Sequence, residues 1–254
     1  MFLGFVFSTV AHANIISVEP TAALAIPGVY KYFGANDIED GQNSYGIGPL
    51  KDEEVFAKNV VKCAGQIIGV VVAADPDLAR HAASKVKVEY HKLPALLSID
   101  DAIEAKSFFP IPDASIDFGD PDAAFKTADH VLTGTARMGG QEHFYMETQC
   151  CLVVPAMESD EMEIFSSTQD ATIVQLAVAR MLNVGMHKIT SRVKRVGGGF
   201  GGKESRTVPY ALATAFVASK MGRPVRFMLD RDHDMMSSGT RHPVLGKYRY
   251  NASY

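Results

Sequence analysis

Short hydrophobic runs separated by turn residues characterise the first hundred residues. Runs of this kind, rich in Val, Ile and aromatic side chains, predict β-strands. The predicted strands are Ile15–Val18, Val29–Phe33, Gln66–Ala73 and Val86–Tyr90. Pro76–Ser84 is predicted as a helix, and residues 36–48, rich in Gly, Asn and Asp, as a loop. The pattern indicates a small mixed α/β unit.

The second half alternates strands and helices in a longer rhythm. The predicted strands are Glu163–Gln169, Lys188–Val196 and Val225–Leu229, and the predicted helices are Ala171–Leu182 and Ser205–Lys220. The first helix has an apolar face of Val174, Ala177, Val178 and Met181 at helical spacing. The first strand ends in a polar tip that contains Gln169, and the second runs into a glycine-rich loop. The carboxyl ends of parallel strands in α/β sheets are where ligands bind. If the first two strands are parallel, Gln169 and Phe200-Gly201 converge on one site.

Five glycines surround Phe200 between Val196 and Glu204. Such a loop allows a ligand to approach the main chain closely. It matches the dinucleotide-binding spacing G-x-G-x-x-G, but the only nearby acid for a ribose, Asp230, comes later than usual. It also matches G-x-x-x-x-G-K, but Glu204 stands where a P-loop needs Ser or Thr and would repel phosphates. A glycine-rich connection without a ligand is the remaining alternative.

Several linked motifs are spread along the chain. The later motifs are Gly140–Thr148, Ser167–Gln169, Arg195–Glu204 and Gly222–Arg231. The earlier ones are Ala11–Val18, Ile26–Val29, Glu54–Ala57, Gly65–Ala73, Val88–Ala95 and Ile99–Ile103. Together they resemble the xanthine dehydrogenase and aldehyde oxidase family of molybdenum hydroxylases, and the resemblance covers nearly the whole chain from about residue 9. It implies an α+β or α/β fold: a small α/β hammerhead domain over residues 1–108, a linker over 109–122, and the first part of a molybdopterin-binding α/β domain over 123–254.

The resemblance also implies roles for individual residues. Gln169 would contact the oxygen ligand of the molybdenum centre, and Phe200 with Gly201 would present its backbone to the apical side of the metal. Gly199 would belong to the same cofactor-binding loop. Glu204 would orient the substrate, since a carboxyl group can bond the ring nitrogens of a purine; aldehyde oxidases generally lack this acid. Its alternative role is to stabilise the N-terminus of the following helix. Asp170 departs from the family pattern, which has an amide or a small residue there.

In function, the resemblance implies part of an enzyme that oxidises hypoxanthine and xanthine to urate with water as the oxygen source. The 2Fe-2S clusters, FAD and NAD are expected only in the full-length protein, as is a homodimer. The family's general base lies far downstream, so no catalytic residue is expected in this fragment, and residues 1–254 alone are predicted to be inactive. An aldehyde oxidase fragment is one alternative. The other is a non-catalytic module that binds a nucleotide or a partner through the glycine loop.

Composition narrows the partners further. The chain has 254 residues, and 47% of them are hydrophobic, which is enough for a sizeable core in one or two domains. Its net charge of −4 argues against a nucleic-acid-binding protein. No stretch is long enough to cross a membrane. A local group of cations is suited to a phosphate-bearing cofactor; its members are Arg192, Lys194, Arg195, Lys203 and Arg206.

Single residues complete the predictions. The spacing of Cys63, Cys150 and Cys151 matches no iron–sulfur or zinc site, and we expect all three side chains to be buried. We also expect the protein to be in a reducing compartment, the cytoplasm or the peroxisome. Residues 1–13 read like a signal peptide without its positive region. The family resemblance runs through Ser8–Ala13 and implies a strand there, so a strand is expected and secretion is the alternative. His143 is expected to be structural, and the acids around Arg231 to form a strand-end turn with local ion pairs.

Overall fold

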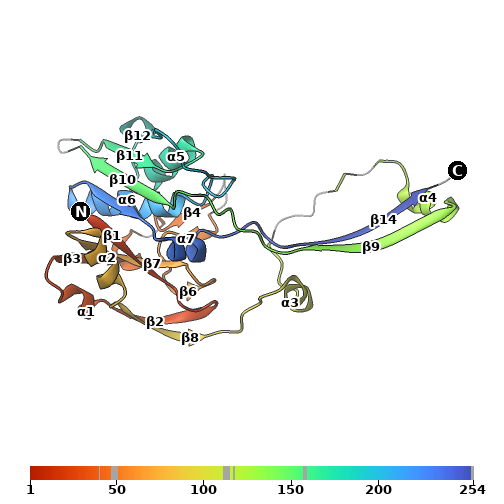
Figure 1. Cartoon of the computed structure of the whole chain (residues 1–254), viewed down its shortest axis with the longest axis horizontal. Coiled ribbons are helices and arrows are strands. Elements are labelled where there is room, and N and C mark those ends of the chain that lie inside the picture. The colour runs from red at the N-terminus through yellow and green to blue at the C-terminus, as the bar shows by residue number, and fades with distance from the viewer. Residues whose placement is uncertain (40, 47–50, 111–114, 117, 157–158, 253–254) are drawn as a thin grey trace. The chain divides into compact units, whose positions relative to one another are not determined.

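The computed structural model describes every residue except 40, 47–50, 111–114, 117, 157–158 and 253–254 (Figure 1). The chain divides into two compact units. The first comprises Met1–Pro94 and His143–Gly239, and the second comprises Ala95–Glu142 and Thr240–Tyr254. The predicted division into residues 1–108, 109–122 and 123–254 stays a prediction, and part of that linker, like residues 47–48 of the predicted loop, lies outside the described residues.

A mixed sheet of seven described strands forms the centre of the first unit, in the order β12-β11-β10-β13-β1-β7-β3. The strands are β1 (Phe2–Phe7), β3 (Val29–Gly34), β7 (Ile67–Ala73), β10 (Cys150–Pro155), β11 (Met162–Ser166), β12 (Ile189–Arg192) and β13 (Val225–Met228). Strand β1 pairs with β13 in parallel and with β7 in antiparallel orientation. The N-terminal and later segments of the chain therefore share one sheet.

Both faces of this sheet are covered, which explains the uninterrupted apolar sequence of β7. Every residue of β7 is buried, because alternate side chains enter two different clusters. Val70 and Val72 face the cluster that contains α6 (Val208–Met221), and Val71 faces the cluster that contains Ala82 of α2 (Pro76–Ala83). Helix α6 is apolar on nearly all sides and buried over most of its length.

Smaller elements complete the first unit. Helix α5 (Ala171–Leu182) packs against α6 and β12. A second sheet has the order β6-β2-β8, and a two-stranded pair joins β4 to β5. The remaining bounds are β2 (Ala13–Glu19), β4 (Ser44–Tyr45), β5 (Glu53–Glu54), β6 (Val60–Val61), β8 (Lys87–Lys92), α1 (Thr21–Leu24), α7 (Arg231–Ser237) and the 3₁₀ turns η1 (Ala35–Asp37) and η2 (Met186–Lys188).

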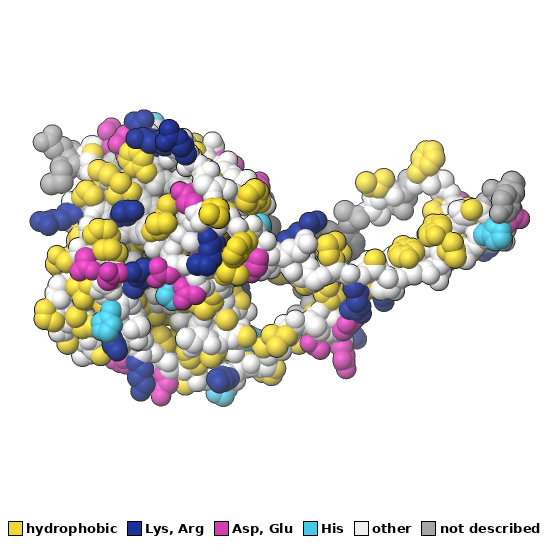
Figure 2. Space-filling view, viewed as in Figure 1, with side chains coloured by type: hydrophobic (Ala, Val, Ile, Leu, Met, Phe, Trp, Pro, Cys, Tyr) yellow, Lys and Arg dark blue, Asp and Glu magenta, His cyan; other side chains and the backbone are white. Residues whose placement is uncertain are grey.

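The second unit is built around a ribbon of two antiparallel strands, β9 (His130–Met138) and β14 (Val244–Ala252). Their register places exposed apolar side chains on one face, as Figure 2 shows along the ribbon; they are Leu132, Met138, Val244, Tyr248 and Tyr250. The opposite face is polar and carries Arg137 and Arg249. These pair with Asp100 of α3 (Ile99–Glu104) and Asp122 of α4 (Pro121–Thr127), so both helices bind the polar face.

Most predicted elements are confirmed, some to within a residue. The predicted helix Ala171–Leu182 matches α5, and Val174, Val178 and Met181 of its predicted apolar face are buried. The N-terminal strand is also confirmed as β1, but it ends at Phe7. Residues 9–12 form a bend before β2, whereas the resemblance placed a strand over Ser8–Ala13. No helix in the described part of the chain combines the length and apolarity needed to span a membrane.

Three predicted elements need correction. The strand predicted to reach Val196 ends at Arg192, because its partner β11 ends at Ser166 and offers no further backbone to pair with. The helix predicted from Ser205 begins at Val208, after a series of turns over residues 200–207.

The acids around Arg231 form the third correction, because they belong to helix α7 and not to a turn. Asp232 and Asp234 lie in its first turn, where negative charge is favourable to the helix dipole. The expected local ion pair is present between Arg231 and Asp234 at 3.6 Å. Cys63 is exposed and Cys150 is half-buried; of the three cysteines only Cys151 is buried as expected.

Candidate functional site

Gln169 and the glycine loop (residues 196–204) meet at the carboxyl ends of two neighbouring parallel strands. Strands β11 and β12 pair in parallel, as the convergence argument required. The backbone N–H groups of Gly201 and Lys203 donate to Gln169 Oε1 at 3.0 and 3.2 Å. The Gln169 N–H donates in return to the Lys203 carbonyl at 2.8 Å. The predicted convergence is therefore confirmed.

These bonds fix the orientation of the Gln169 amide. Two backbone N–H donors require an acceptor, so the oxygen of the amide faces the loop and the NH₂ group faces away. Among the described residues, that NH₂ group has no hydrogen-bond partner, and the side chain is exposed. Gln169 therefore offers two N–H donors to a ligand with an oxygen acceptor.

The loop backbone offers further donors beside this amide. Gly198, Phe200 and Gly201 have φ angles of +95°, +53° and +90°, the left-handed region that L-residues rarely adopt. Within the described part of the chain, the N–H groups of Gly198, Gly199 and Phe200 make no hydrogen bond. Consecutive N–H groups in a turn of mixed handedness form a typical binding site for anionic or oxygen ligands.

Gly199 leaves room for Gln169. A Cβ atom at this position would lie 2.3 Å from Gln169 Oε1, well inside van der Waals contact. Phe200 is 74% exposed despite its size, so its ring does not support the loop from inside. The sequence therefore maintains backbone access here at the expense of apolar burial.

An ion pair between buried Lys203 and half-buried Glu147 lies beneath the loop, and it corrects the prediction that Lys203 belongs to a cation group for a phosphate-bearing cofactor. The side chain of Lys203 is 0% exposed, with Nζ 2.8 Å from Glu147 Oε2 and 2.6 Å from Ser167 Oγ. Glu147 Oε2 also accepts from Ser167 Oγ and from the Gly197 N–H at 2.9 Å. Burial acts to raise the pKa of the Glu147 carboxyl, but its three donors outweigh burial and hold that pKa below its ordinary range.

The predicted cation group does not form a common binding surface. Lys203 is buried, Arg192 pairs with Glu163 at 2.7 Å, and Arg206 pairs with Glu53. Only Lys194 and Arg195 of the predicted group are exposed without an ion pair in the described structure. The spacing of basic residues along the sequence did not indicate which of them face carboxylates inside the protein.

Glu204 lies at the surface beside the loop. Because α6 begins at Val208, Glu204 is outside the first helical turn, and its alternative role as a dipole-stabilising residue is not supported. Its carboxylate has no ion pair or hydrogen bond with any described residue. A ligand held at the loop could therefore use it.

Asp170, the departure from the family pattern, has a local explanation. Its Oδ1 accepts from the N–H groups of Thr172 and Ile173 at 2.9 and 3.0 Å, so it is the N-cap of α5. The capping signal was present in the sequence, because Asp is a preferred N-cap and directly precedes a periodic apolar run. The charge of Asp170 thus serves the helix.

Sequence reasoning missed the residues that hold the segment 143–149 against the loop. Asp234, 2% exposed, accepts from the Gln149 N–H at 2.8 Å, and Gln149 Nε2 donates to the Gly202 carbonyl at 3.2 Å. Arg231 Nη2 donates to the carbonyls of Tyr145 and Met146 at 2.6 and 2.8 Å. The ring of half-buried His143 stacks on Tyr145 at 6.4 Å; its structural role stays a prediction.

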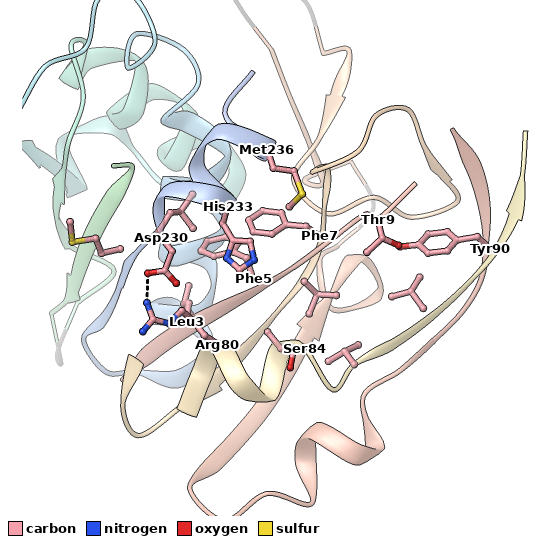
Figure 3. Close-up of a pocket in the computed structure, with 16 residues that line it drawn as sticks. Leu3, Phe5, Phe7, Thr9, Arg80, Ser84, Tyr90, Asp230, His233 and Met236 are labelled. Carbon is pink, nitrogen blue, oxygen red and sulfur yellow. Dashed lines mark hydrogen bonds and ion pairs between the residues drawn. The ribbon is translucent and has the colours of Figure 1, made fainter. Parts of the chain in front are cut away.

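A separate cavity of about 250 Å³ lies elsewhere in the first unit (Figure 3). Phe5 and Phe7 of β1 and Tyr90 of β8 contribute apolar walls, and Arg80 pairs with Asp230 at its edge. No residue of the glycine loop lines it. Asp230, Asp232 and His233 place ligand atoms within 4.8 Å of one another, but the Arg80 pair already neutralises Asp230.

Comparison with known proteins shows the family of the chain. Residues 105–253 match the family model described as the molybdopterin cofactor-binding domain. Residues 1–94 match that of the aldehyde oxidase and xanthine dehydrogenase a/b hammerhead domain. The chain belongs to the molybdopterin cofactor-binding domain family. The predicted resemblance and the predicted fold class, a hammerhead and a molybdopterin-binding domain of mixed α and β structure, are confirmed.

Relatives and solved structures agree with this membership. The chain is 49% identical to the xanthine dehydrogenase of Calliphora vicina and 48% identical to the xanthine dehydrogenase/oxidase of Mus musculus, over 98% and 97% of its length. It spans 18% of each of these relatives. Quinoline 2-oxidoreductase from Pseudomonas putida 86 is 27% identical with a TM-score of 0.78, covering 92% of this chain and 31% of that one.

The fold alone is shared with the aldehyde oxidoreductase of Desulfovibrio desulfuricans ATCC 27774. That structure is 22% identical with a TM-score of 0.87, over 99% of this chain and 29% of that one.

The residues at the loop fit a molybdopterin-bound metal. Such a group carries oxygen ligands and a phosphate, which accept hydrogen bonds. The Gln169 NH₂ and the unpartnered N–H groups of Gly198, Gly199 and Phe200 are donors of the kind that those oxygens need.

Proposed function

We propose that this chain forms part of the molybdenum site of an enzyme resembling xanthine dehydrogenase, which oxidises hypoxanthine and xanthine to urate with water as the oxygen source. One observation carries the proposal: Gln169, whose NH₂ has no partner among the described residues, lies against the glycine loop, where the backbone N–H groups of Gly198, Gly199 and Phe200 also make no hydrogen bond. The relatives named xanthine dehydrogenase support the choice of reaction.

The chain would contribute positioning and hydrogen bonding. Gln169 would donate from its NH₂ to an oxygen ligand of the metal, and the backbone of Gly199, Phe200 and Gly201 would face the cofactor. When bound, the molybdenum cofactor supplies the two-electron oxidation and the transfer of oxygen from water. The protein holds that group and the substrate in fixed relative positions, which is the contribution that proximity makes to rate.

Glu204 is proposed to select the substrate. A purine presents ring N–H groups and imine nitrogens, and the unpartnered carboxylate of Glu204 can accept from the former or, when protonated, donate to the latter. A simple aldehyde has no N–H to offer. The free carboxylate therefore favours a purine substrate over an aldehyde. An aldehyde oxidase is the second candidate function.

The complete reaction needs groups that we place outside residues 1–254. We propose that a general base, 2Fe-2S clusters, FAD and NAD belong to further domains of the same enzyme, which would act as a homodimer in the cytoplasm or peroxisome. The described residues at the loop include no carboxylate other than Glu204 and the paired Glu147. Residues 1–254 alone would then bind without turnover.

The test is metal analysis combined with two substrates. The native protein, purified from its source, is assayed for molybdenum and for oxidation of xanthine and of an aldehyde. Molybdenum together with a clear preference for xanthine is the expected result. A preference for the aldehyde would favour the second candidate. Absence of molybdenum from freshly isolated protein, with tight nucleotide binding instead, would replace the proposal with a non-catalytic binding module.

A further inference from the structure

Lys203 is a buried lysine whose main chain brackets Gln169. The Lys203 N–H donates to Gln169 Oε1 at 3.2 Å, and the Lys203 carbonyl accepts from the Gln169 N–H at 2.8 Å. The same carbonyl accepts from Thr168 Oγ1 at 3.0 Å. Both the main chain and the side-chain amide of Gln169 are therefore placed relative to one residue of the loop.

The side chain of Lys203 anchors that main chain from below. Its Nζ bonds Glu147 and Ser167 and lies 4.6 Å from the centre of the Tyr145 ring. Glu147 also accepts from the N–H of Gly197 at the start of the loop. One ammonium group thus connects the β11 end, the 143–149 segment and both ends of the glycine loop.

Stability alone does not account for such a pair. The side chain of Glu147 is 30% exposed, so water screens the pair, and the free energy needed to bury the ammonium group of Lys203 offsets much of the remaining attraction. A loop rich in glycine, by contrast, has many accessible conformations and needs specific anchors to hold one of them. The directional bonds of an ammonium group provide such an anchor.

We infer that Lys203 is a positioning residue: its buried ammonium group holds the glycine loop and Gln169 in the arrangement that receives the cofactor. The role of the loop as a cofactor site rests on the proposed function, whereas the anchoring itself rests only on the contacts above. Lys203 touches neither cofactor nor substrate in this account, and acts through the backbone of the loop.

Three variants of the native protein separate anchoring from stability. Lys203→Met removes the ammonium group and leaves Glu147 unpaired. The double variant Lys203→Met/Glu147→Gln removes both charges, so no uncompensated carboxylate remains. Lys194→Met is the matched control, since Lys194 is an exposed lysine close to the loop without an ion pair in the described structure.

The readouts are hydrogen exchange of peptides covering residues 165–172 and 197–204, thermal unfolding, and molybdenum content. In both variants that lack Lys203 we expect exchange in these peptides to accelerate by about 100-fold and molybdenum to fall severalfold. The double variant should unfold close to the wild-type temperature. Faster exchange in the loop would then be a local effect and not the result of lower stability of the whole protein. The Lys194→Met control should match the wild type in all readouts.

Wild-type loop exchange and molybdenum content in the double variant would overturn the inference and leave Lys203 as half of a structural ion pair. Loss of exchange protection across the whole protein, equal to the loss in the loop, would overturn it as well. If the wild-type protein itself holds no molybdenum, the proposed function fails, but the exchange comparison still decides whether Lys203 anchors the loop.

Discussion

The glycine loop and the cavity beside β1 differ in how their polar groups are satisfied. The cavity has about 250 Å³ of space, and its most prominent charges, Arg80 and Asp230, are paired with each other (Figure 3). No residue of the loop lines that cavity. Its surface presents the NH₂ of Gln169 and consecutive N–H groups that make no hydrogen bond within the described structure.

In this chain, polar groups without hydrogen-bond partners indicate a binding site better than the volume of a cavity does. Polar groups normally find partners in a folded protein, so a cluster without them calls for a ligand. Conformations that are unfavourable for side chains point the same way, because they persist only where the surroundings hold them. Phe200, with φ +53° and an exposed ring, is such a residue.

The largest expected effect comes from adding one methyl group at Gly199. In Gly199→Ala the new Cβ would lie 2.3 Å from Gln169 Oε1, and the flexible side chain of Gln169 would be displaced. Displacing a binding group by about 1 Å can lower turnover by about 100-fold. We expect turnover and molybdenum content of the native protein to fall together.

Stability should change little in the same variant, which sharpens the contrast between site and scaffold. The φ of Gly199 is not left-handed, so alanine is tolerated by the backbone and contributes about 0.4–1 kcal/mol through the unfolded state. Two lost hydrogen bonds cost about 1 kcal/mol each. Gly139→Ala, where an added Cβ meets nothing within 4 Å, is the control. Normal molybdenum content in Gly199→Ala would contradict the site.

An effect of similar size, but confined to one substrate, is expected from Glu204→Gln. The amide retains the size of the side chain but loses the carboxylate that would bond a purine N–H. We expect kcat/KM for xanthine to fall by about 100-fold, with aldehyde oxidation and molybdenum content retained. The measurement is steady-state kinetics with both substrates, and Asp232→Asn is the matched exposed control. Equal losses for xanthine and aldehyde would show that Glu204 does not discriminate between them.

The sequence predicted the convergence of Gln169 with the loop because that depends on a rule of parallel strands. The rule needs only the element order, and β11 and β12 follow it. The apolar face of α5 was predictable for a similar reason, since helical spacing is a local property. Membership of the family rested on motifs spread over the whole chain.

What the sequence could not provide was the direction of single side chains. Lys203 was placed in a group of cations suited to a phosphate-bearing cofactor, but it points inward to Glu147, which is 56 positions earlier in the chain. Asp234 and Gln149 are joined across 85 positions. Contacts at such separations depend on how the layers pack. The start of α6 at Val208 was missed because Ser205, Arg206 and Thr207, which lie in the turns before it, include no glycine or proline that would separate them from the helix.

Acid is expected to have an effect on the glycine loop that is smaller than those of the two substitutions above. The folded-state pKa of Glu147 is lowered, so its contribution to stability is complete above the usual value of 4.5 and is lost as pH falls through the folded pKa. We expect hydrogen exchange in residues 197–204, corrected for its intrinsic pH dependence, to accelerate as pH falls below about 4.5. Glu147→Gln should remove this part of the pH response. An identical acid response in that variant would assign it to other carboxylates.

The smallest effect is expected at the cavity. Arg80→Met removes its ion pairs with Asp230 and with Asp77. The side chains of Arg80, Asp230 and Asp77 are 37%, 46% and 83% exposed, and such pairs contribute about 1 kcal/mol or less because water screens them. For a chain of this size that lowers the unfolding temperature by about 2–4 °C. The loop should be unaffected, so molybdenum content and xanthine turnover should equal the wild type. A clear loss of molybdenum in Arg80→Met, measured beside Gly199→Ala, would reverse the comparison, because binding would then depend on the region whose charges are already satisfied.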